Sequence, residues 1–246
     1  MSDQSENRGS GSHALLEKNG STHDSHEACL REELLHHFPY AVFSVAIGFV
    51  VLALVSVIGV GLTADAQVMR SGYHVLFHSF HYLHLVFAVT GTCITFLRFS
   101  SSLLRCIAVS LLAPALFCTL SDVALPALVG QILGGEMDVH ICFFSPRDLL
   151  NTLPFMGAGL LAGFSIAGHY RPFLNIVSMG AHFAHILISS LAAIFYMVSN
   201  GFEEWFTMMG PLFFLLIIAV VVPCTISDVI VPMYFARRSC ECDERH

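Results

Sequence analysis

Long apolar runs, separated by short polar segments, account for most of this chain. Six runs come close to or exceed the roughly 20 residues that a helix needs to cross a bilayer. They cover residues 39–63, 73–96, 103–134, 149–168, 173–199 and 208–236. In lipid, only helices and closed barrels satisfy the backbone hydrogen bonds, and continuous apolar runs of this length indicate helices. The sequence therefore predicts an all-α integral membrane protein with six transmembrane helices.

Composition agrees with a membrane location. The chain is 55% hydrophobic and 12% charged, with a mean hydropathy of +0.72. Soluble domains carry about 25% charged residues, roughly twice this fraction. Residues 1–30 are polar and contain no apolar signal segment, so we expect the first span to direct insertion. Arg237 and Arg238 are the nearest approach to a basic patch, which argues against a nucleic-acid partner and leaves the lipid bilayer as the main one.

Lysine and arginine residues predict the orientation. With six spans, both tails, the loop between spans 2 and 3, and the loop between spans 4 and 5 share one side. Only Arg70 and Arg147 lie on the opposite side. Because the cytoplasmic side carries the excess of positive charge, we expect both termini in the cytoplasm and the chain in the cell membrane. The residues on the predicted cytoplasmic side are Arg8, Lys18, Arg31, Arg98, Arg105, Arg171, Arg237, Arg238 and Arg245.

A nine-residue motif occurs twice in the chain. Segments 118–126 (CTLSDVALP) and 224–232 (CTISDVIVP) are identical at six of nine positions. Two other similarities precede the motif in the same order in both copies, and the offsets of the three matches along the chain are 115, 104 and 106 residues, the last being that of the motif. The sequence therefore predicts that a three-helix unit has been duplicated. The matching pairs are Pro39 with Pro154, His78 with His182, and His81 with His185.

Three spans per copy make the second copy enter the membrane in the opposite orientation to the first. This inverted arrangement resembles inverted-repeat transporters, in which sites lie near the interface of the repeats. Before the first copy, we expect a disordered cytoplasmic tail with histidines at 1–30. Six helices are few for a transporter, which favours a homodimer. The remaining expected segments are repeat 1 at 31–134, an outer loop at 135–148, repeat 2 at 149–236 and a cytoplasmic Cys/His tail at 237–246.

Two aspartates lie deep inside apolar spans. Asp122 and Asp228 occupy the same position of the repeated motif, and Pro126 and Pro232 follow one turn later. An intramembrane carboxylate is costly unless it is paired or hydrated, so it is a functional candidate by default. Each proline frees a backbone carbonyl near the aspartate and favours a kink. The alternative is an aspartate that only forms structural hydrogen bonds with neighbouring helices.

Histidines accompany both aspartates. On span 2, His74, His78 and His81 fall on one helical face, with His84 at its edge. On span 5, His182 and His185 have the i, i+3 spacing that brings two side chains together. Imidazole nitrogens and carboxylate oxygens suit Fe, Mn or Zn better than Na or K. Haem ligation, a proton relay and a structural network are the alternatives.

Depth along the spans predicts one metal set in the outer half of the membrane and one in the inner half. The first set is His78, His81 and Asp122, and the second is His182, His185 and Asp228. Other histidines of span 2, together with residues at span ends and in the outer loop, supply weaker candidates: His74, His84, His36, His37, Asp148 and His140.

The leading functional hypothesis is a permease for a divalent Fe, Mn or Zn cation, rather than an enzyme. No nucleotide-binding motif is present, so transport would be secondary or powered by a partner. An intramembrane Zn or di-iron enzyme is the second hypothesis, against which the separation of the two sets argues. A b-type haem subunit is the third, and a purely structural membrane subunit is the fourth.

Overall fold

The computed structural model describes residues 10–62, 65–135, 137, 146–169 and 174–236. These residues form helices and no strands, which confirms the all-α class. Six helical segments within this part of the chain are long and apolar enough to cross a membrane, so the protein is a multi-pass membrane protein by length and composition. The segments agree with the predicted spans: His37–Gly61, Ala66–Phe99, Leu103–Ile132, Asp148–Gly168, His182–Ser199 and Met209–Phe235.

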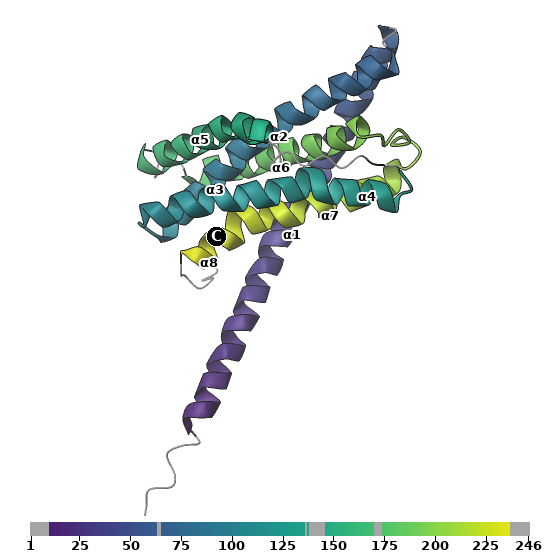
Figure 1. Cartoon of the computed structure of the whole chain (residues 1–246). Coiled ribbons are helices and arrows are strands. Elements are labelled where there is room, and N and C mark those ends of the chain that lie inside the picture. Colours follow the sequence, from purple (N-terminus) through teal and green to yellow (C-terminus); the bar gives the residue numbers. More distant parts are fainter. Residues whose placement is uncertain (1–9, 63–64, 136, 138–145, 170–173, 237–246) are drawn as a thin grey trace, which may run out of the picture.

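The first helix, α1 (Ser10–Gly61), is much longer than a bilayer requires. It crosses the other helices steeply, and its N-terminal part extends away from them (Figure 1). Residues 10–30, for which composition predicts disorder, belong to this helix in the structure. Pro39 lies inside it, close to the start of the membrane span.

Two helices form the centre of the bundle. α2 (Ala66–Phe99) and α6 (Leu174–Ser199) pack along each other more extensively than any other pair among the described residues. α5 (Pro146–His169) covers α2, and α1 covers α6. The span in α6 is the most buried of the six and the span in α5 the least. His81 and His84 on α2 and His185 on α6 are buried inside this bundle.

Polar and apolar residues are distributed as a membrane requires. Many large apolar side chains, such as Leu104, Leu112 and Phe214, face outward. Buried polar side chains gather inside the bundle, because lipid would leave their hydrogen bonds unsatisfied. They include Ser44, His81, His84, Thr92, Ser110, Ser121, Asp122, Thr152, His185, Ser189, Ser190, Thr225, Ser227 and Asp228.

Both copies of the nine-residue motif interrupt their helix with a π-helix. η1 (Leu120–Ala124) connects α3 (Leu103–Thr119) to α4 (Leu125–Ile132). η3 (Ile226–Ile230) connects α7 (Met209–Thr225) to α8 (Val231–Phe235). In each, the residue directly before the proline donates its backbone N–H to the carbonyl five residues earlier in the chain. Such turns are rare and often occur at functional sites, and here each one contains the intramembrane aspartate.

Small residues let α5 approach α2 closely. A Cβ atom on Gly159 would lie 2.7 Å from the Val86 carbonyl oxygen, and one on Gly163 would lie 2.7 Å from Cys93 Cβ. The Thr90 hydroxyl also donates to the Gly159 carbonyl at 3.0 Å. Glycines spaced by four residues commonly allow such contact between membrane helices. This packing helps to set the rotation of α2, on which His81 and His84 are buried in the interior.

Candidate metal centre

Asp122, in η1, is fully buried and accepts four hydrogen bonds. Its Oδ2 lies 2.9 Å from His81 Nδ1 and 2.7 Å from His84 Nδ1. Its Oδ1 accepts from the hydroxyls of Ser121 and Ser189, both at 2.8 Å. An ionised carboxylate only accepts hydrogen bonds, so this set of donors fits a charged Asp122 with both histidines protonated on Nδ1. Ser189 belongs to α6, which ties the first copy of the motif to the second half of the chain.

Asp228, in η3, has fewer partners. Its Oδ2 lies 2.5 Å from Nδ1 of His185 on α6. Its Oδ1 is buried and has no hydrogen-bond partner among the described residues. A Cβ atom on Gly91 of α2 would lie 3.2 Å from Oδ2, so this glycine makes room for the carboxylate. A buried oxygen without a partner is costly and is a candidate position for a cation or water.

The two halves of the chain meet at a pair of imidazoles. His84 Nε2 and His185 Nε2 lie 2.6 Å apart, and both side chains are buried. Each ring presents Nδ1 to a carboxylate, Asp122 or Asp228. With Nδ1 donating on both sides, the two Nε2 lone pairs face one another. The contact is attractive only when a proton or a metal cation lies between the nitrogens.

Two thiols adjoin this pair. Cys118 Sγ lies 3.7 Å and Cys224 Sγ 3.8 Å from His84 Nε2. Ligand atoms of His84, His185 and Cys224 all lie within 4.8 Å of one another, and all three residues are buried. Among the described residues, this is the group with the composition and spacing of a metal site. Aspartates that hold the outer ring nitrogen of a ligating histidine are usual around such sites.

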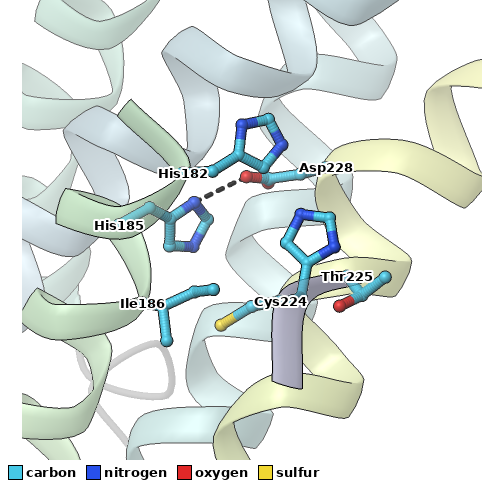
Figure 2. A pocket seen from close by; sticks show the side chains of 7 residues that line it. His182, His185, Ile186, Cys224, Thr225 and Asp228 are labelled. Carbon is cyan, nitrogen blue, oxygen red and sulfur yellow. Dashed lines mark ion pairs between the residues drawn. The ribbon is translucent and has the colours of Figure 1, made fainter. Parts of the chain in front are cut away.

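A small cavity adjoins His185 and Asp228, as Figure 2 shows. The centre of a water molecule could occupy about 10 Å³ of this cavity, which is close to the room that one water needs. The rings of His37 and His182 line this cavity, and their centroids are 5.1 Å apart. The lining residues are His37, His182, His185, Ile186, Cys224, Thr225 and Asp228.

The first predicted ligand set differs from the one that the structure assembles. His81 contacts Asp122 as expected, but the second histidine at Asp122 is His84, one turn further along α2. His78 Nε2 instead lies 3.2 Å from His74 Nε2 on the exposed side of the helix. The difference arises because the packing of α2 against α5 and α6 turns its more C-terminal histidines inward.

In the second predicted set, His185 pairs with Asp228, and His182 lines the cavity beside them. His37 reaches the same cavity from α1. Asp148 lies in the first turn of α5, where its carbonyl accepts from the Thr152 hydroxyl. The side chain of His36 and all of His140 lie outside the described residues.

Depth along the spans predicts two separate ligand sets, whereas His84 and His185 bring them into contact in the structure. Cys118 and Cys224 are missing from the predicted ligand sets. A signal for both was present, since each cysteine begins one copy of the nine-residue motif. Comparison of the chain with protein-family models, with curated proteins and with solved structures finds no match.

Proposed function

We propose that the protein is a permease of the cell membrane for a divalent transition-metal cation, with Fe, Mn and Zn as candidate substrates. The contact of His84 Nε2 with His185 Nε2 carries this proposal. Each imidazole belongs to a different copy of the proposed inverted repeat, and each has an aspartate behind it. In transporters built from inverted repeats, the substrate lies at the interface of the repeats, on interrupted helices.

The packing supports an inverted repeat. Both copies of the nine-residue motif contain a π-helix at the same position. α5 packs on α2 as α1 packs on α6. Gly163 and Gly48, which correspond at the offset of 115, lie at these two interfaces. A Cβ atom on Gly163 would lie 3.3 Å from the Thr90 carbonyl oxygen, and one on Gly48 would lie 3.9 Å from that of Ser190.

This arrangement suits alternating access. In the described part of the chain the centre is buried, with a water-sized cavity on the His185 side. Rocking of one copy against the other would separate His84 from His185 and open a path to one side of the membrane at a time. The lysine and arginine distribution favours both termini in the cytoplasm.

Uptake into liposomes tests the proposal. Purified protein is reconstituted into liposomes that contain a metal-sensitive dye, and influx of Fe²⁺, Mn²⁺ and Zn²⁺ is recorded. We expect influx of at least one cation, and His185→Ala should slow it about tenfold or more. His74→Ala is the matched control, because His74 is an exposed histidine of α2 outside the centre, and its rate should stay close to wild type. Unchanged influx in both His84→Ala and His185→Ala would contradict the proposal.

An intramembrane metalloenzyme is the second candidate, and the same 2.6 Å contact favours it. A compact centre is what such an enzyme needs, and the separation that argues against it from sequence is absent. A permanently bound metal with no influx would favour the enzyme. A haem subunit gains no support, because a porphyrin could not lie between two nitrogens this close.

A further inference from the structure

Three donors converge at the centre of the bundle. One ligand atom from each of His84, His185 and Cys224 lies within 4.8 Å of the other two, and the two Nε2 atoms are 2.6 Å apart. They come from α2, α6 and α7, so the tertiary structure alone brings them together. All three side chains are nine-tenths or more buried. Both nitrogens are aimed by a carboxylate behind the ring, as is usual for histidines that bind a metal.

We infer that the site takes a thiophilic cation, Zn²⁺ foremost, and that His84, His185 and Cys224 are its ligands. The inference rests on the proposed function and narrows its substrate. Asp122 and Asp228 then orient the imidazoles instead of binding the cation directly. This assignment differs from the predicted His-His-Asp sets, in which each carboxylate is a ligand.

The geometry is close to that of a zinc site. With Zn–N bonds of about 2.0–2.1 Å and a Zn–S bond of about 2.3 Å, tetrahedral coordination puts N and S about 3.5 Å apart. The His84 Nε2 to Cys224 Sγ distance is 3.8 Å. The two nitrogens, now 2.6 Å apart, would move to about 3.3 Å, a displacement that rotation of two side chains can supply.

The ligand types determine which cations compete. A thiolate favours Zn²⁺ and other soft or borderline ions, whereas Mn²⁺ prefers oxygen ligands. Three protein ligands leave the fourth position of a tetrahedral site open. Cys118 Sγ, 3.7 Å from His84 Nε2, is the nearest further sulfur and comes from the other copy of the motif. An open position allows the cation to exchange ligands, which a transported ion must do.

Cobalt spectroscopy on the full-length purified protein tests the ligand set. Co²⁺ bound to a thiolate shows a charge-transfer absorption that cobalt bound only by nitrogen and oxygen lacks. We expect this band in wild type, its loss on adding Zn²⁺, and its persistence in excess Mn²⁺. Cys224→Ser should remove most of the band and weaken Zn²⁺ binding on the order of 100-fold.

Cys106→Ser is the matched control. Cys106 is buried in α3, 3.6 Å from Cys93 Sγ, and lies outside the three-residue group. This variant should keep both the band and the affinity for Zn²⁺. The wild-type band is informative even if Cys224→Ser does not fold, because it reports thiolate ligation without any substitution.

The outcomes separate this inference from the proposed function. Co²⁺ binding without a thiolate band, or a full band in Cys224→Ser, overturns the ligand set and leaves a transition-metal permease with nitrogen and oxygen ligands. Tight competition by Mn²⁺ also overturns it. Failure of Co²⁺, Zn²⁺, Fe²⁺ and Mn²⁺ to bind at all overturns the permease as well.

Discussion

The two aspartates of the repeated motif occupy similar helices but different surroundings. Asp122 accepts four hydrogen bonds, two from histidines and two from serines. Asp228 has one ion pair with His185 and one buried oxygen without a partner. Both lie in a π-helix and both are followed by a proline.

The difference assigns distinct tasks to the two carboxylates. A fully satisfied carboxylate holds its surroundings rigid, since removing any donor or acceptor leaves a buried group unpaired. A carboxylate with a spare oxygen beside a cavity can accept a further proton, water or cation. Sequence duplication therefore does not imply equal surroundings: Asp122 holds two histidines and two serines, and Asp228 borders a small cavity, which under the proposed function lies on the path of the ion.

The largest effect should come from the aspartates themselves. Asp122→Asn replaces an acceptor with a donor amid four donors, and should cost about 3 kcal/mol or more of unfolding free energy. Asp228→Asn should cost less, about 1.5–3 kcal/mol, because the bond described for this carboxylate is a single charge-assisted one to His185. Unfolding in mixed micelles by increasing SDS measures both. Equal losses would mean that the two carboxylates are equally constrained.

A smaller effect is expected at the interface of α5 with α2, the helix whose histidines contact Asp122. Gly159→Ala forces a Cβ against the Val86 carbonyl and should destabilise the protein by about 1–3 kcal/mol. At the corresponding interface of α1 with α6, a Cβ on Gly48 meets the tip of Ile194, which can rotate away, so Gly48→Ala should cost less. Gly157→Ala is the control, since nothing lies within 4 Å of its Cβ position. SDS unfolding again supplies the measurement, and a loss for Gly157→Ala as large as for Gly159→Ala would contradict the packing.

His182, at the cavity beside Asp228, should matter more for transport than His78, the corresponding histidine of the first copy. His182 lines it, while the corresponding His78 contacts His74 on the exposed side of α2. We expect His182→Ala to slow metal influx into liposomes about tenfold, and His78→Ala to change it little. The reverse order would place the path on the Asp122 side.

The smallest effect should come from a single serine. Ser189→Ala removes one of two donors to Asp122 Oδ1 and should cost about 1 kcal/mol, because Ser121 still donates to that oxygen. Ser190→Ala serves as control, because Ser190 is a buried neighbour whose hydroxyl donates to the Ile186 carbonyl instead of Asp122. It should cost less when both variants are unfolded with SDS. If Ser189→Ala costs no more stability than Ser190→Ala, the surroundings of Asp122 do not depend on all four hydrogen bonds.

Much of the architecture is readable along the chain. Six spans follow from run length alone, and their bounds agree with the structure to within a few residues for most spans. The duplicated motif marks both π-helices, because the same sequence with the same proline adopts the same local backbone. The choice of Asp122, Asp228, His81 and His185 as candidates follows from the cost of burying polar groups in lipid, and all four side chains are buried in the structure.

The partners of these residues do not follow from the chain. Helical periodicity identifies the face that His74, His78 and His81 share, but not the rotation of α2 within the bundle. That rotation depends on Gly159, Val86 and other contacts distant in sequence. It turns His84 inward and leaves His78 near the surface.

The sequence by itself determines which groups are buried in the membrane, since hydropathy and helix length are properties of consecutive residues. Only the tertiary structure decides that His84 meets His185 and that Cys224 joins them. These residues belong to α2, α6 and α7. Their meeting point depends on how the three helices are rotated and packed against one another, which no local sequence pattern records.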